Sequence, residues 1–152
     1  MRVLATSRAL LAALTVLFVA PLTGVLTPSE ASAQEVARLD AQIQVIVASS
    51  DGTGFDASLQ PIAPNLTRQF SLFDSFRLDA NHSLILRVGE TRTVALPGGG
   101  EAAFELVSFD NGEASVRIAI PGGSSTITTR GGLVFVGGSL APDGRIILAI
   151  TT

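Results

Sequence analysis

The chain has 152 residues, with 13 acidic and 10 basic side chains and a formal net charge of −3 at pH 7. This length fits a single domain, and the negative charge gives no electrostatic footprint for nucleic acid or anionic lipid. The sequence contains no cysteine, which excludes disulfide bonds, thiol catalysis and cysteine-ligated metals. We therefore expect a fold that is stabilised by packing alone.

The first 33 residues have the order of a secretory signal peptide. Arg2 and Arg8 give a positive start, an apolar segment follows over residues 9–20, and Ala31-Ser32-Ala33 has the form of an A-x-A cleavage site. We expect cleavage after Ala33, so that Gln34 begins the mature protein. The sequence thus predicts export to the periplasm or the medium, with membrane contact only during export.

An uncleaved membrane anchor is the alternative interpretation of the same segment. Residues 9–26 are mostly apolar and reach the lower length limit for a membrane-spanning helix. Pro21 and Gly24 interrupt this stretch, and the A-x-A triplet follows it. These features favour a cleaved signal peptide at 1–33.

The mature part is predicted to be mainly β. Residues 34–39 are polar and we expect them to form a flexible arm, followed by one β-rich domain over 40–152. Apolar runs in this domain are separated by Gly- and Pro-containing turns at short intervals. That pattern predicts an antiparallel β-sandwich or a barrel-like domain of about eight short strands.

One short helix is expected among the strands, at about 66–73. Leu66, Phe70 and Phe73 are spaced to share one helical face, and Asn65 stands where an N-cap residue would. The preceding stretch, 55–64, contains two prolines and is predicted to be a loop. A lone helix among strands must lay its apolar face on a sheet.

Among the strands, 145–151 is predicted to be central. Ile146 to Ile150 are apolar at every position, which indicates burial on both faces. The tight turn at 141–144 predicts pairing with Leu133 to Val136, and we expect the other edge of 145–151 to be covered as well. Asn111-Gly112 is the strongest hairpin signal.

The remaining strands are expected between these turn signals. Two separate short strands are predicted at 75–79 and 83–88, and the threonine-rich stretch at 125–130 is predicted to be an edge strand. The other expected strands lie at 40–48, 92–96, 102–109 and 114–120.

The sequence offers no catalytic set, cofactor motif or metal-ligand set. His82 is the only histidine, and adjacent Ser83 and nearby Asp79 superficially resemble the partners of a catalytic triad. Neighbouring residues on an extended chain point to opposite faces, so His82 cannot easily reach Ser83. We interpret His82 as a surface residue in a turn.

Two carboxylate-rich regions leave a hydrolase open as an alternative. Glu101, Glu105, Asp110 and Glu113 flank one predicted hairpin, and glycosidases use a pair of such groups. Asp51 and Asp56 fall in a polar loop, but their spacing does not fit the calcium loop of an EF-hand. The absence of Trp and Tyr argues against the aromatic platforms of a sugar site.

The function that best fits these features is that of an exported, non-enzymatic binding or structural domain, such as an accessory of the cell envelope or of secretion. Its partner would be a protein or an envelope component. We expect the partner surface at an exposed sheet edge or at Phe70, Phe73 and Phe76. A binder of a small apolar ligand inside the sheet is a further alternative, and a Phe-lined cavity would mark it.

Overall fold

The computed structural model describes residues 37–152. The predicted signal peptide, its cleavage site and the first residues of the predicted arm lie outside this range. The described part is mainly β and contains two sheets, as predicted. Sheet A has the order β2 (Gly54–Phe55), β3 (Ser75–Arg87), β1 (Arg38–Ser49), β9 (Gly144–Thr151), β8 (Leu133–Ala141). Sheet B has the order β4 (Thr91–Ala95), β5 (Glu101–Asp110), β6 (Glu113–Ile120), β7 (Gly123–Thr129).

Strand β9 lies inside sheet A, which confirms its predicted central position. It pairs antiparallel with β8 on one side and with β1 on the other. Its five apolar residues, Ile146 to Ile150, are all buried. Alternate residues of a strand point to opposite faces, so β9 contributes side chains to two separate cores, one on each face of sheet A.

The inter-sheet core fills the space between the two sheets. Sheet A contributes alternate residues of β1 and β9, including Ile43, Val45 and Leu148, while Phe104 and Val116 belong to the opposing β5 and β6. All five side chains are almost fully buried. Each sheet therefore buries the apolar face of the other sheet, as expected for strands with one apolar face.

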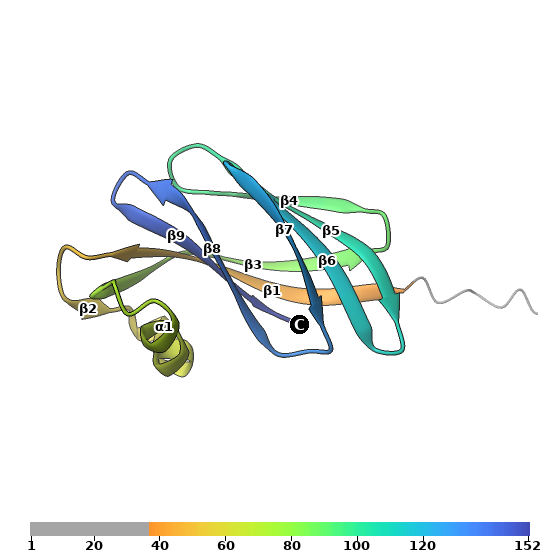
Figure 1. The fold of residues 1–152 in the computed structure, drawn as a ribbon, viewed down its shortest axis with the longest axis horizontal. Coiled ribbons are helices and arrows are strands. Elements are labelled where there is room, and N and C mark those ends of the chain that lie inside the picture. Colours follow the sequence, from red (N-terminus) through yellow and green to blue (C-terminus); the bar gives the residue numbers. More distant parts are fainter. Residues whose placement is uncertain (1–36) are drawn as a thin grey trace, which may run out of the picture. The chain divides into compact units, whose positions relative to one another are not determined.

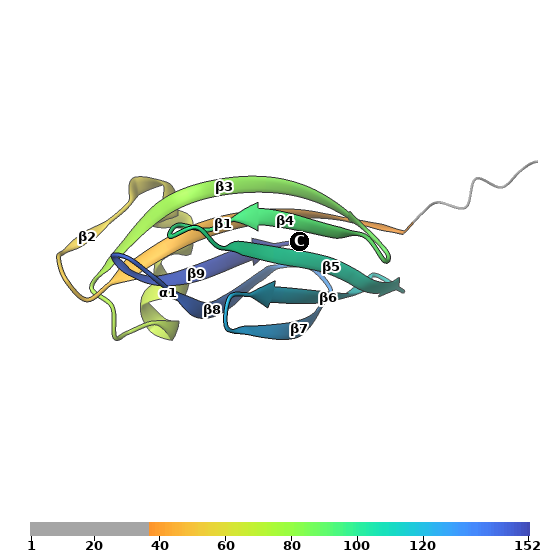
Figure 2. The same ribbon diagram turned by 90° about the horizontal axis from the view of Figure 1, so that it is seen from above.

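The helix-side core lies on the other face of sheet A. Ile46, Ile147 and Ala149 project there and pack with Leu59 and Leu66, which come from a 3-10 helix (Ala57–Ile62) and from α1 (Ala63–Gln69) respectively. Figures 1 and 2 show this helical segment at the end of the sheets that also carries β2. A single helical layer thus covers part of sheet A, as the predicted helix required.

The predicted bounds of the helix were wrong. Helical structure begins earlier, because the prolines taken as loop signals occupy tolerated positions: Pro61 lies in the 3-10 helix, and Pro64 is in the first turn of α1. Asn65 is therefore inside α1, where its Oδ1 accepts a hydrogen bond from Arg68, and is not the N-cap. Phe70 ends the helix, so Phe73 lies beyond it.

Strand β3 replaces the two short strands predicted at 75–79 and 83–88. It runs without a turn and pairs with β1 along its whole length, with one register irregularity opposite Val45 and Ile46. The polar stretch Asp79 to Ser83 resembles a turn in sequence, but its backbone is held by the neighbouring strand. At the other end of this pair, β1 begins at Arg38, within the stretch predicted as an arm.

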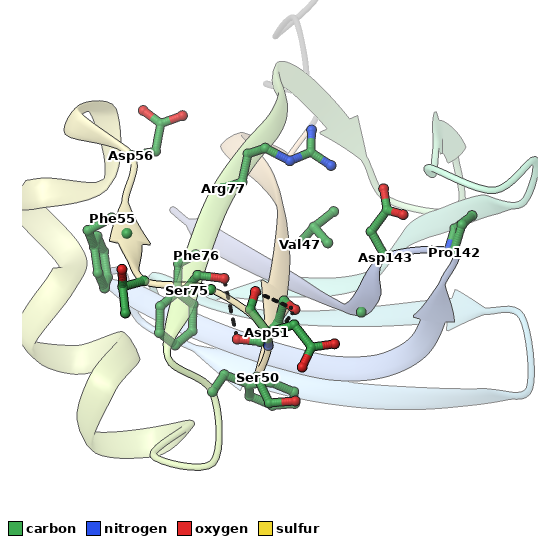
Figure 3. A pocket seen from close by; sticks show the side chains of 16 residues that line it. Val47, Ser50, Asp51, Phe55, Asp56, Ser75, Phe76, Arg77, Pro142 and Asp143 are labelled. Carbon is green, nitrogen blue, oxygen red and sulfur yellow. Dashed lines mark hydrogen bonds between the residues drawn. The ribbon is translucent and has the colours of Figure 1, made fainter.

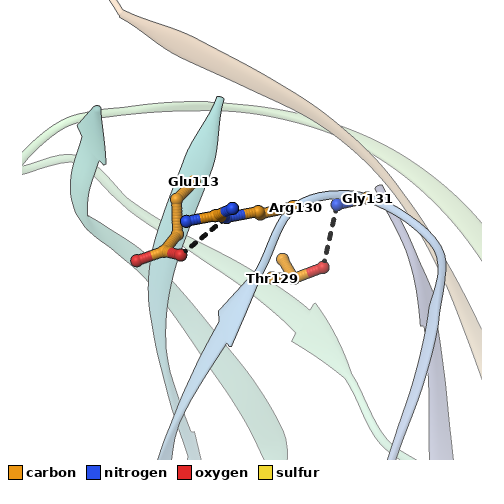
Figure 4. Close-up of polar contacts among 4 residues, drawn as sticks. All are labelled: Glu113, Thr129, Arg130 and Gly131. Carbon is orange, nitrogen blue, oxygen red and sulfur yellow. Dashed lines mark hydrogen bonds and ion pairs between the residues drawn. The ribbon is translucent and has the colours of Figure 1, made fainter. Parts of the chain in front are cut away.

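The connection from β7 to β8 carries the chain from sheet B to sheet A. Thr129 is buried, and its Oγ1 accepts a hydrogen bond from the Gly131 N–H at 3.1 Å, as Figure 4 shows. Gly131 and Gly132 both have positive φ angles, 108° and 107°, which glycine adopts readily. The backbone of Gly132 then exchanges two hydrogen bonds with Thr152. This crossing leaves β7 and β8 as edge strands of different sheets, and the edge position of β7 is confirmed.

Candidate functional site: an uncharged sheet edge between two hollows

Strand β8 forms a free edge of sheet A. It pairs with β9 on one side, and the sheet ends there. Its sequence, LVFVGGSLA, contains no charged residue and no proline, two of the devices by which proteins protect an edge strand from pairing with other chains. A register irregularity between Gly137 and Leu140 interrupts its far half, so the regular unprotected edge runs from Leu133 to Gly137. The other edges carry charge: β4 contains Arg92, β7 is followed by Arg130, and β3, which is an edge beyond the two-residue β2, ends in Arg87. Among the edges in the described residues, β8 is thus the one suited to accept another strand.

A hollow of about 440 Å³ adjoins β8 on the helix side. Phe135 and Gly137 of β8 line it together with Phe70 and Leu72, which follow α1. The rings of Phe70 and Phe135 meet edge to face, with centroids 5.9 Å apart. Leu72 is 84% exposed, and Gln69 and Arg145 line the hollow as well, so this helix-side hollow combines an uncovered apolar surface with one basic side chain.

A second hollow, of about 300 Å³, adjoins β8 on the inter-sheet side. Val136 and Gly137 line it from β8, and Ile118 and Ile120 line it from β6. It lies where the two sheets separate beyond their shared core. Ser124 and Ser125 line it as well, so this inter-sheet hollow combines apolar and polar side chains.

The edge and the two hollows form one arrangement. Gly137 belongs to the lining of both hollows, because it lies on the strand that separates them. A strand added along β8 would direct alternate side chains to opposite faces of sheet A. One apolar side chain could enter each hollow, while main-chain hydrogen bonds held the added strand.

The predicted phenylalanine surface is only partly available. Phe76 is 2% exposed and belongs to the helix-side core, where its ring lies 5.0 Å from that of Phe55. It is therefore too deeply buried to contact a partner. Phe70 and Phe73 are partly buried and line the helix-side hollow. Leu72, Phe135 and Leu140 were not foreseen from the sequence.

A third hollow, of about 860 Å³, lies at one end of sheet A. The loop after β1 forms one side, with Asp51, and the turn between β8 and β9 forms another, with Asp143. Figure 3 shows Arg77 and Asp143 on either side of Val47, and Asp56 at the far rim beside Phe55. This end hollow is the most polar of the three, and its lining includes two aspartates from the segment after β1, Asp51 and Asp56, and one from the β8–β9 turn, Asp143.

Asp56 already has a structural role within the end hollow. Its Oδ1 accepts hydrogen bonds from the Ser58 hydroxyl at 2.6 Å and the Ser58 N–H at 2.9 Å, and so caps the 3-10 helix. These bonds favour the ionised form and lower the pKa of the Asp56 carboxyl below its usual value. Asp56 is thus poorly suited to donate a proton as a general acid near neutral pH.

Two of the four carboxylates that flank the β5–β6 hairpin, Glu105 and Glu113, are paired with arginines. Glu105 Oε2 accepts a hydrogen bond from Arg117 at 2.8 Å, and Glu113 Oε2 accepts one from Arg130 at 2.9 Å, as seen in Figure 4 for the second pair. Both pairs connect neighbouring strands of sheet B. Their arrangement indicates stabilisation of the sheet surface, worth at most about 1 kcal/mol per pair.

His82 lies inside β3, not in a turn. It is opposite Ile43 in the register of β1 and β3, so it shares the face of the inter-sheet core. Ser83 points to the other face, where its Oγ accepts a hydrogen bond from Gln42 at 2.6 Å. The Nε2 atom of His82 is buried without a hydrogen-bond partner. The two residues therefore cannot act together in a triad.

Replacing His82 by leucine should stabilise the protein. The substitution removes a buried polar atom without a partner, whose burial costs about 1–3 kcal/mol, so we expect a gain of about 1 kcal/mol in the free energy of unfolding. Urea denaturation measures this gain. The variant His82→Gln, which keeps a polar group, serves as the control and should show no gain; a His82→Leu variant less stable than the wild type would refute this interpretation.

The described residues show no further centre of chemistry. Among residues 37–152, no group of three or more His, Cys, Asp or Glu side chains is arranged to hold a metal ion. None of the helices in the same range is both long and apolar enough to cross a membrane. Comparisons with protein-family models, curated proteins and solved structures found no match to this chain.

Proposed function

We propose that the protein is an exported, non-enzymatic binding domain that captures an extended protein segment by strand addition at β8. The observation that carries this proposal is the free, uncharged edge of β8 between two hollows that are each lined in part by apolar side chains. Strand addition uses main-chain hydrogen bonds for affinity and side-chain pockets for selectivity. Export is proposed from the signal-peptide pattern of residues 1–33.

The exposed leucines beside the edge support a binding role. Leu72 and Leu140 are 84% and 79% exposed, more than any other large apolar side chain in the described residues. Leu140 belongs to β8 itself, and Leu72 lines the helix-side hollow. Covering both on binding would bury apolar area that is otherwise hydrated.

A small apolar ligand is a weaker interpretation of the same region. The helix-side hollow is lined by Phe70, Phe73 and Phe135, but it lies at the surface beside β8 and not within the sheets. The side chains between the sheets, such as Phe104 and Ile118, are packed against one another in the inter-sheet core. The helix-side hollow is therefore better suited to a side chain of an added strand than to a small ligand.

A carboxylate hydrolase of envelope polymers is the second candidate, favoured by the three aspartates of the end hollow. A glycosidase needs one carboxyl group that is protonated and one that is ionised. The Ser58 hydrogen bonds favour the ionised form of Asp56, so Asp56 could serve only as the ionised member of the pair, and the proton donor would have to be Asp51 or Asp143. Their hollow lies at the end of sheet A, away from the paired stretch of β8.

Photo-crosslinking in intact cells tests the binding proposal. A photo-reactive residue at position 140 or 72 of the full-length chain should give a defined crosslinked product. In that product this chain should begin at Gln34, because the signal peptide has been removed. The same residue at position 85 is the control, because Ile85 is also exposed but lies on β3, with β1 and β9 between it and β8. Equal crosslinking at position 85 would refute binding at β8, and a cytosolic product that retains residues 1–33 would refute export.

A further inference from the structure

We propose that the strand accepted by β8 is the β8 of a second copy of this chain, paired antiparallel about a twofold axis at Phe135. This inference rests on the proposed function, since it names the partner at the same edge. In such a pair each copy both donates and accepts one strand, so the assembly closes at two copies. Sheet A would then continue through the axis as one sheet.

The absence of charged side chains favours β8 over the other edges for pairing with a second copy. In the proposed register residues 133–137 of the two copies pair with each other, and none of them is charged. Pairing β4 with its own copy would instead place Arg92 near its symmetry mate, and the β3 edge would bring several charged residues together, Arg77 and Arg87 among them. Like charges opposite each other destabilise strand pairs.

The β8 side chains on the helix side of sheet A are compatible with this register. With Phe135 opposite itself, Leu133 of the second copy lies opposite Gly137, on the same face of the sheet. Gly137 has no side chain, and the Phe70 ring lies over it, since a Cβ at Gly137 would stand 3.1 Å from Phe70 Cε1. Leu133 of the second copy would therefore pack against Phe70 beside the helix-side hollow.

The same register fits on the inter-sheet side. Val134 of the second copy lies opposite Val136, which lines the inter-sheet hollow with Ile118 and Ile120. Valine pairs are favourable across strands because branched side chains pack well on the pleated surface. Both hollows thus receive an apolar side chain from the same added strand.

Cysteine crosslinking tests the register, because the chain has no cysteine of its own. In the proposed pair, residue 134 of one copy faces residue 136 of the other at roughly 4.5–5.5 Å between Cα atoms, a distance that a disulfide can bridge. Proteins purified from cells expressing full-length Val134→Cys and Val136→Cys chains should form a disulfide-linked dimer when mixed and oxidised. Each variant alone should not, since residue 134 lies diagonally from its own copy. Crosslinking of either variant alone to the same extent as the mixture would refute this register.

Sedimentation equilibrium tests the pairing itself. The wild-type protein should be a dimer, and Leu72→Arg should raise the dimer dissociation constant about ten-fold or more, because a guanidinium would be buried in the hollow that Arg145 also lines. Ile85→Arg is the matched control and should leave the constant unchanged. A monomer that still crosslinks to a different protein through position 140 would refute self-pairing and leave the proposed function intact. Absence of both the dimer and the crosslink would refute both proposals.

Discussion

Replacing Gly144 by alanine should cost about 3 kcal/mol or more of unfolding free energy. Gly144 begins β9 with a φ angle of 152°, and a Cβ there would collide with the backbone carbonyl of Ala48 in the neighbouring β1. A backbone group held in a sheet ladder cannot move aside as a flexible side chain could. The collision would therefore have to be relieved by separating β1 from β9 at the end of sheet A.

Gly122→Ala is the control for the conformational part of this effect. Gly122 also has a positive φ angle, 95°, but a Cβ there would meet nothing within 4 Å. We expect a loss of about 1 kcal/mol from the left-handed backbone alone. Urea denaturation of the three proteins gives both values. Similar losses for the two variants would show that the contact with Ala48 carries no extra cost.

The parts of the fold that the sequence predicted well are those where local chemistry and tertiary structure agree. Asn111 and Gly112 have φ angles of 51° and 76°, as their hairpin turn requires, and they connect β5 and β6 directly. The five apolar residues of β9 could be buried on both faces only inside a sheet. In both places the local sequence is compatible with only one structure, a tight hairpin turn in the first and a central strand in the second.

The errors arose where local and tertiary signals differ. Pro64 lies in the first turn of α1, where a proline is tolerated, and Pro61 lies near the end of the short 3-10 helix. The sequence alone does not say which position a proline occupies. The polar stretch from Asp79 to Ser83 has the composition of a turn, yet pairing with β1 extends it into one strand. In β3 the ladder hydrogen bonds to a distant segment outweigh the local preference.

The candidate site depends on contacts that no local pattern contains. The absence of charge from Leu133 to Ala141 is visible in the sequence and was the signal that could have marked β8 as unprotected. That β8 is an edge follows only from the sheet order, which the sequence left open. The hollows need Phe70 and Ile120 to meet Gly137 from two different layers, so their position could not be predicted.

Truncating Ile147 to alanine should cost about 2–5 kcal/mol and should weaken the helical layer most. Ile147 is fully buried in the helix-side core, where it packs with Leu59 and Leu66, the side chains that attach the 3-10 helix and α1 to sheet A. Its neighbour Leu148 points into the inter-sheet core instead. Leu148→Ala should therefore cost a similar total but leave the attachment of α1 intact.

Urea denaturation and amide hydrogen exchange together separate these two effects. Both variants should lose stability by a similar amount, with exposed Thr151→Ala as a control that changes it by less than about 0.5 kcal/mol. Amides of α1 should lose more protection than those of β6 in Ile147→Ala, and the reverse should hold in Leu148→Ala, because local opening follows the core that was weakened. Equal loss of protection in both regions for both variants would show that the two cores unfold as one unit, and that the helical segment beside the β8 edge cannot open independently of the sheets.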